Sequence, residues 1–191
     1  MRIGDRAAPR RARGVSLIEL IVFIVIVSVG IVGILSVLNF TAAKGADPMF
    51  RKQVLSVAEA LLEEVELMPF TYCDPDDANA ATAQSAVVGA SGCATTVEAI
   101  GPEAGESRYS TTAPFDNVND YHDFSMTGIR DLTNTAIVGL ENYSASVTVS
   151  RGGLGLANAD VLLIAVTATG PRNESVTLSA YRTRYAPNSL P

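Results

Sequence analysis

The sequence predicts an α+β protein with one membrane-spanning helix near its N-terminus and an antiparallel sheet near its C-terminus. Residues 20–38 form an uncharged apolar window of 19 residues, which spans about 28 Å as a helix and matches the hydrocarbon thickness of a bilayer. Residues 54–68 repeat apolar side chains at helical spacing. Residues 143–185 contain three segments with the length and pattern of strands.

Charge divides the chain at Gly14. Residues 1–14 carry five arginines against one aspartate, whereas the remainder carries nine basic and 19 acidic side chains. Arginines beside a single span keep that end in the cytoplasm, so we expect the acidic remainder on the other side of the membrane. This acidic remainder argues against nucleic acid as a partner, because phosphate binding needs clustered Lys and Arg.

The two cysteines, Cys73 and Cys93, both lie on the expected exported side. In an oxidising compartment a disulfide between them is favoured over two free thiols. It closes a segment of about 20 residues and contributes about 3 kcal/mol in the chain-entropy account.

The junction at residues 13–20 places a carboxylate, Glu19, at the start of the apolar window. An acid in a lipid-embedded helix is a functional candidate, and three interpretations are open. Glu19 marks the headgroup level of a simple anchor, or the window is a cleavable secretory signal with residues 41–43 near its cleavage site. The secretory-signal interpretation is the weaker of these two, because secretory signals have apolar cores of about 7 to 15 residues and this window has 19.

The third interpretation is a resemblance. Gly14, Val15 and Glu19 match the processing motif of type IV prepilins and pseudopilins, in which a glycine precedes the first mature residue and a glutamate stands at the fifth. The resemblance implies that a prepilin peptidase cleaves between Gly14 and Val15 and N-methylates Val15. It also implies that Glu19 pairs with the amino group of Val15 on a neighbouring subunit. The departure is Val15, where the family usually has Phe or Met.

The organisation that follows has four parts. Residues 1–14 are the cleaved basic leader, 15–46 the hydrophobic transmembrane and assembly helix, 47–68 an amphipathic second half of the helix, and 69–191 a periplasmic globular domain. An interruption is expected at residues 45–48, with Asp47 as N-cap and Pro48 in the first helical position. The buried face of 47–68 is expected to comprise Val54, Val57, Ala58, Leu61, Val65 and Met68, with Glu63, Glu64 and Glu66 solvated.

The globular part begins with a turn-rich region, 69–128, and continues as an antiparallel sheet, 129–186. Residues 143–150 alternate apolar and polar side chains, residues 161–169 form an apolar run, and residues 175–185 follow a turn at 170–173. This spacing predicts a meander of three strands. A helix, a long loop and an antiparallel sheet make up the pilin-like architecture that the resemblance implies.

Two acidic clusters are candidates for metal sites. Asp74, Asp76, Asp77 and Asn79 lack the glycine and distal glutamate of an EF-hand loop. The second cluster offers enough oxygens for calcium and comprises Asp116, Asn117, Asn119, Asp120 and Asp123. Turns also prefer Asp and Asn, which accounts for both clusters, so no metal and no cofactor are expected.

Nothing in the sequence indicates catalysis. His122 is the single histidine and no motif around it supplies an activated nucleophile. The Gly-rich segment 152–155 lacks the Lys-Ser/Thr of a phosphate-binding loop and is expected to be a hairpin loop. An enzyme is therefore not predicted.

The resemblance extends to segments 47–49, 73–77, 115–121 and 178–183, which look like parts of minor pilins of the mannose-sensitive haemagglutinin (MSHA) pilus type. It implies a minor pilin, a structural or initiating subunit inserted in the inner membrane and then carried to the pilus surface. Its implied partners are prepilin peptidase, other pilin subunits, the inner-membrane pilus assembly machinery and the lipid bilayer.

Two alternatives stay open at this point. One is a minor pseudopilin of a type II secretion system. The other, of a different class, is an adhesin borne on the filament. An exposed aromatic patch near Tyr109, Phe115, Tyr121 or Phe124 favours adhesion, and a bare sheet edge favours contact between subunits.

Overall fold

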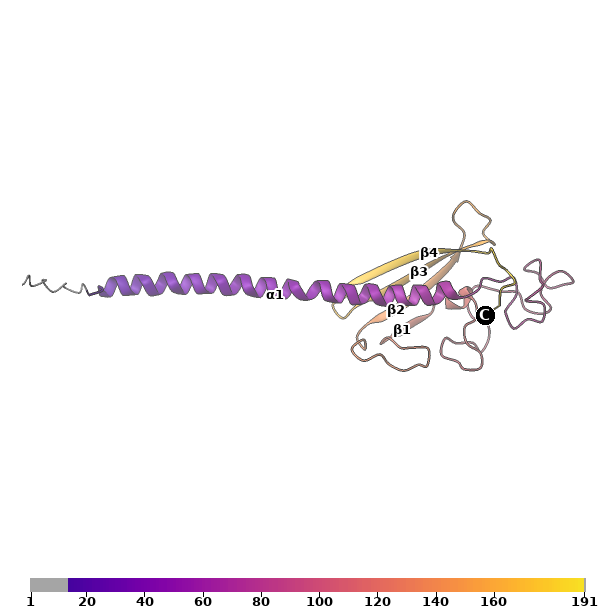
Figure 1. Cartoon of the computed structure of the whole chain (residues 1–191), viewed down its shortest axis with the longest axis horizontal. Helices are drawn as coiled ribbons and strands as arrows, with labels where there is room; N and C mark the ends of the chain where they lie inside the picture. Colours follow the sequence, from indigo (N-terminus) through magenta and orange to yellow (C-terminus); the bar gives the residue numbers. More distant parts are fainter. Residues whose placement is uncertain (1–13, 191) are drawn as a thin grey trace, which may run out of the picture. The chain divides into compact units, whose positions relative to one another are not determined.

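The computed structural model describes residues 14–190, so of the leader predicted at residues 1–14 all but Gly14 lies outside the described part. The chain divides into two compact units, residues 1–46 and 47–191. The element order is α1 (Leu17–Leu67), the 3-10 helix η1 (Val118–Tyr121), β1 (Ser125–Thr127), β2 (Ser144–Arg151), β3 (Val161–Thr169) and β4 (Ser175–Thr183). This is the pilin-like α+β architecture predicted from the sequence (Figure 1).

Helix α1 passes through the place where we expected an interruption. Its backbone is helical over residues 45–48, and Pro48 lies inside the helix. A proline removes one helical hydrogen bond because it has no N–H, and its ring crowds the preceding turn. The backbone nevertheless stays helical through Pro48, so the expected break with Asp47 as N-cap is wrong.

The second half of α1 is amphipathic as predicted. The face that is buried comprises Val54, Val57, Ala58, Leu61 and Val65, with Met68 partly buried beside them. Arg51, Lys52, Glu59, Glu63 and Glu66 are exposed. Glu64 differs from its neighbours, because it is partly buried and binds Arg108. The prediction that all three glutamates are solvated is therefore wrong for Glu64.

The sheet is an antiparallel meander in the order β1-β2-β3-β4. Its inner face is set by register: Val149 pairs with Ile164, and Val147 pairs with Val166, which pairs in turn with Leu178. These side chains join the buried face of α1 in one core. Figure 1 shows the strands alongside the C-terminal part of α1.

The predicted strands agree with the observed ones at β2, β3 and β4, and the observed β1 was not predicted. β1 has three residues and pairs with β2 alone, so it carries too little alternation to stand out in a sequence. Between β3 and β4 the chain turns at Gly170, where Asn173 adopts a left-handed conformation, φ 63°. Asparagine is among the residues that tolerate this region of φ.

The region predicted as a long loop, 69–128, is held by specific contacts. A disulfide joins Cys73 to Cys93, whose Cα atoms lie 5.4 Å apart. Asp77 accepts backbone N–H bonds from Asn79, Ala94, Thr95 and Thr96 at 2.7–2.8 Å. These bonds hold the pKa of the Asp77 carboxyl far below its usual range, the bond from Thr96 having the largest effect.

Candidate functional site

The first candidate site is the start of α1. Gly14 and Val15 are exposed and precede the helix, and the Ser16 carbonyl accepts the first helical bond from the Leu20 N–H at 3.1 Å. Glu19 lies in the first turn. It takes part in neither ion pair seen among the side chains that the structure describes. The structure thus places the three motif residues together at an exposed helix start.

The helix that follows has no covering from the rest of the chain. Leu17–Thr41 has a mean hydropathy of 3.1, is long and apolar enough to cross a membrane, and none of it is buried. Val15 is 71% exposed and Phe23 62%. An uninterrupted apolar surface of this size marks a segment that lipid or other protein covers.

Two hydroxyl side chains of this segment form hydrogen bonds within the helix. The Ser28 hydroxyl donates to the Ile24 carbonyl at 2.7 Å, and the Thr41 hydroxyl lies 3.0 Å from the carbonyls of Val37 and Leu38. Such bonds to the preceding turn allow a hydroxyl to sit in an apolar environment. Glu19 is the charged side chain in 15–41, and so the side chain there that can form an ion pair with another molecule.

The second candidate site is an acidic cluster in the globular unit. It forms where the segment after Cys73 meets the segments around Glu98–Glu106 and η1. We use "acidic cluster" for its seven carboxylates, which are Asp74, Asp76, Glu98, Glu103, Glu106, Asp116 and Asp120. The ligand oxygens lie within 4.8 Å of one another in three overlapping groups. Both acidic clusters of the sequence contribute, together with three glutamates that sequence reasoning missed.

Backbone contacts bring these segments together. The Glu98 N–H donates to the Tyr72 carbonyl at 3.1 Å, and the Gly101 N–H donates to the Asn119 carbonyl at 3.1 Å. Asp116 lies just before η1, where the backbone N–H groups of Asp116 and Asn117 donate to Asp120 Oδ2 at 2.9 and 2.8 Å. Turn chemistry thus uses one oxygen of Asp120, as the sequence analysis anticipated.

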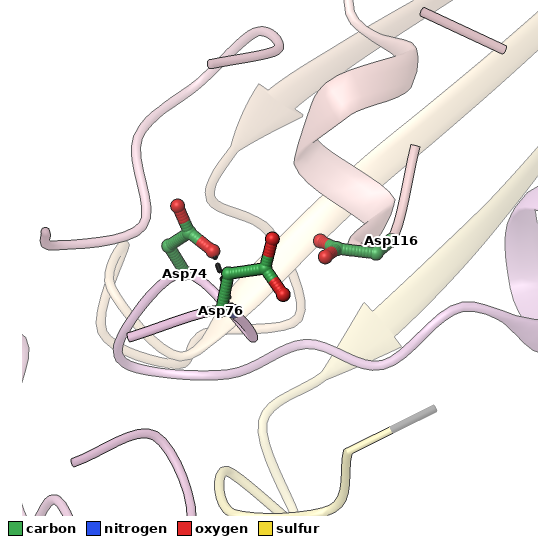
Figure 2. Close-up of side chains that lie close together, drawn as sticks. All are labelled: Asp74, Asp76 and Asp116. Carbon is green, nitrogen blue, oxygen red and sulfur yellow. Dashed lines mark hydrogen bonds between the residues drawn. The ribbon is translucent and has the colours of Figure 1, made fainter. Parts of the chain in front are cut away.

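The outermost group of the cluster comprises Asp74, Asp76 and Asp116. Figure 2 shows the Asp116 carboxylate directed from the segment before η1 toward Asp76. Asp74 Oδ1 accepts the Asp76 N–H at 2.7 Å, which fixes the turn that carries both aspartates.

Two aspartates of the predicted clusters lie apart from this group. Asp77 turns inward to the backbone of 94–96. Asp123 is exposed, with an oxygen 3.4 Å from His122 Nε2. His122 Nδ1 accepts the Val149 N–H at 3.2 Å, so this imidazole ties η1 to the sheet.

The electrostatics of the acidic cluster are those of crowded, partly buried acids. Burial, followed by repulsion from Asp120, raises the pKa of Glu98 to about 10 and the pKa of Glu106 to about 8. Burial also raises the pKa of Asp120 to about 7, and burial with repulsion from Asp74 raises that of Asp116 to about 6. Each shift reports the cost of holding a negative charge here.

The aromatic residues singled out in the sequence form a packed group and not a surface patch. Phe115 is 9% exposed and Tyr121 1%. Both stack edge to face with each other and with Phe124, and Tyr109 packs on Phe124 as well. The exposed aromatic patch that favours adhesion is not formed by these four residues.

Comparison with known proteins bears on the first candidate site. Residues 9–35 match the family model of the prokaryotic N-terminal methylation motif. No curated protein and no solved structure matches the chain. The matched residues include Gly14, Val15 and Glu19 and the uncovered helix as far as Leu35. The chain therefore carries the prokaryotic N-terminal methylation motif, the type IV prepilin-like signal, at the head of a pilin-like α+β fold.

Proposed function

We propose that the protein is a minor pilin, a structural or initiating subunit of a type IV pilus of the MSHA type, assembled through its N-terminal helix. The observation that carries this proposal is the combination of the methylation motif with an apolar helix that no part of its own chain covers. A globular subunit with no partner would not keep 25 such residues bare.

The proposed mechanism has three steps. The chain inserts in the inner membrane with its arginine-rich end in the cytoplasm. Prepilin peptidase then removes residues 1–14 and methylates Val15, which becomes a positively charged N-terminus. Finally the helix leaves the lipid for a bundle of like helices, in which Glu19 pairs with the amine of a neighbouring Val15. The pairing offsets the burial of both charges, since neither is tolerated alone in an apolar bundle.

The sheet edge supports a role in subunit contact. β4 is an outer strand, and along it the exposed and partly buried side chains alternate. Of the four aromatic residues named above, Phe115 and Tyr121 are buried, and Tyr109 and Phe124 are partly buried, so they form no exposed patch that would support the adhesin alternative. An edge strand offers unpaired backbone groups to another chain.

The test is to follow the full chain in cells that assemble both type IV pili and a type II secretion system. Filaments are sheared from the surface and probed for the protein, and a strain lacking its gene is assayed for piliation and for enzyme secretion. We expect the protein in the sheared filaments and a loss of piliation with normal secretion. A secretion defect with normal piliation would identify the type II secretion pseudopilin instead, and absence from both assemblies would refute the proposal.

A further inference from the structure

We propose that the inner group of the acidic cluster, Glu98, Glu103 and Asp120, binds a calcium ion. This inference goes beyond the proposed function and does not depend on it, because it concerns the globular unit alone. It also revises our expectation from the sequence that no metal is bound.

The first argument is a buried acid without partners. Glu98 is 2% exposed, and neither of its carboxylate oxygens has a hydrogen-bond partner. Asp120 is fully buried, and its Oδ1 is without a partner although its Oδ2 accepts two backbone N–H bonds. A buried polar group that lacks a partner is costly, and an ionised one much more so. Glu98 and Asp120 belong to the same close group. Three buried oxygens there, both of Glu98 and Oδ1 of Asp120, lack a hydrogen-bond partner. One bound cation would compensate all three.

The second argument is that no cationic side chain in the described part of the chain forms an ion pair with this group. The ion pairs seen among the described side chains join Glu64 to Arg108 and His122 to Asp123, and neither includes Glu98, Glu103 or Asp120. Arg184 lies within electrostatic range of Glu98. Its guanidinium stacks on the rings of Phe70 and Tyr72, at 4.0 and 4.9 Å from their centroids. Its Nε and Nη2 are buried without a hydrogen-bond partner, so Arg184 makes no hydrogen bond from these atoms to the acidic cluster. The remaining candidate partner for these carboxylates is a cation from solution.

The third argument is the chemistry of the ligands. The group offers carboxylate oxygens and neither imidazole nor thiolate, a set that suits hard cations. Calcium binds oxygens at about 2.4 Å, so two oxygens on one ion lie at most about 4.8 Å apart. The ligand oxygens of Glu98, Glu103 and Asp120 lie within that limit.

The position of Glu103 extends the site. Its carboxylate also lies in a close group with Asp74 and Glu106, so further oxygens are near the ion. Calcium accepts six to eight oxygens in irregular arrangements, whereas magnesium demands near-ideal octahedral geometry and keeps its waters. Ligands drawn from three separate segments therefore favour calcium over magnesium.

We assign no ion to the outer group of Asp74, Asp76 and Asp116. Its aspartates are exposed or partly buried, and Figure 2 shows them at the junction of two loops. Acidic residues in such turns are common without a metal. The buried, unpartnered oxygens are the property that separates the inner group from the outer one.

The test uses the full chain in detergent micelles, first stripped with EGTA and then titrated with CaCl2 or MgCl2. Calorimetry measures binding, and thermal unfolding is followed by tyrosine fluorescence. We expect one calcium ion per chain and a melting temperature that rises by roughly 5 °C at about 100 times the dissociation constant. Magnesium at the same concentration should give a much smaller rise. No heat and no shift with 10 mM CaCl2 would overturn the proposal.

Glu98→Gln locates the ion, with Glu59→Gln as a matched control on the exposed face of α1. We expect Glu98→Gln to weaken calcium binding at least tenfold. In EGTA it should melt above the unaltered protein, because the amide has no charge to bury and takes up no proton on folding, whereas the raised pKa of Glu98 makes folding of the unaltered protein carry that cost. In calcium the order should reverse, and Glu59→Gln should behave as the unaltered protein in both buffers.

A purely structural Glu98 would give no such reversal, and calcium binding that survives Glu98→Gln would place the ion elsewhere; either result refutes the assignment. If Glu98→Gln does not fold, Glu103→Gln, at a half-buried position, replaces it with the same expected loss of binding. Unchanged calcium affinity in that variant would equally contradict the proposal.

Discussion

Two halves of one helix meet different environments in this protein. From Leu17 to Thr41 the apolar side chains face every direction and none is buried by the chain. From Val54 to Val65 the apolar side chains lie on one face, and that face is 0–8% exposed against the sheet. The second half is stabilised by its own chain, whereas the first is left for lipid or another protein to cover. Loss of an apolar side chain should therefore register as unfolding in one half and as failed assembly in the other.

The largest expected effect concerns the head of the uncovered half. On coexpression with a prepilin peptidase, the unaltered chain should lose 14 residues and carry a methylated Val15. Gly14→Ala should leave nearly all of the chain at full length, as measured by intact mass.

The control for this experiment is Gly33→Ala, in the same helix, where an added Cβ meets no atom within 4 Å. It should be processed like the unaltered chain. A product that begins near Lys44 would instead indicate cleavage as a secretory signal. The mature protein would then lack the uncovered half of the helix, and the comparison of the two halves would not apply to it.

The second prediction compares two leucines. Leu61, 3% exposed, faces the core, and Leu35, 53% exposed, lies in the uncovered half. Leu61→Ala should lower the free energy of unfolding of the globular unit by about 2–5 kcal/mol, and Leu35→Ala should leave it unchanged. Tyrosine fluorescence during denaturant titration measures this selectively, because all six tyrosines lie beyond residue 70. Equal losses for the two variants would show that both halves unfold as one unit.

The third prediction concerns the Cys73–Cys93 disulfide in the globular unit. Replacing both cysteines by alanine should cost about 3 kcal/mol, since the bond closes a segment of about 20 residues in the unfolded chain. The same denaturant titration measures the loss. Labelling of both thiols in folded, non-reduced protein would contradict the bond itself.

The smallest expected effect is a pH dependence at Asp77. Because its pKa is lowered in the folded state, Asp77 contributes stability above its unfolded pKa of about 3.9, and the contribution is lost as the pH falls below that value. Asp77→Asn should therefore be less stable than the unaltered protein at pH 7, and the difference should shrink toward pH 2. A difference that is constant with pH would rule out the carboxylate as its source.

The regular elements of the globular unit were largely predictable. Residues 161–169 form an apolar run whose limits coincide with β3, and the buried face of α1 follows the helical repeat. Such patterns are local, so a single sequence displays them. The Gly14, Val15 and Glu19 motif is local in the same way.

The acidic cluster could not be assembled from the sequence. Glu98 stands 22 residues before Asp120. Loop contacts such as the Gly101–Asn119 hydrogen bond bring the two together, and loop contacts leave no periodic pattern in the sequence. The one available signal is that Glu98 sits among Val97, Ala99 and Ile100, an apolar setting unusual for an acid. The prediction around Pro48 failed for the opposite reason. Its local sequence is typical of a helix start, yet the helix is continuous through this position.

The central claim is that Glu19 makes the uncovered half an assembly surface, and Glu19→Gln tests it most directly. The measurement is the amount of the protein in sheared filaments relative to the membrane, with Glu59→Gln as control. If Glu19 pairs with a neighbour's N-terminal amine, the variant leaves a buried positive charge without its partner, at a cost of about 3–5 kcal/mol. Filament recovery should then fall on the order of 100-fold or more, with membrane level and leader removal unchanged. Recovery equal to that of the control would contradict the claim and leave Glu19 as a marker of the membrane edge.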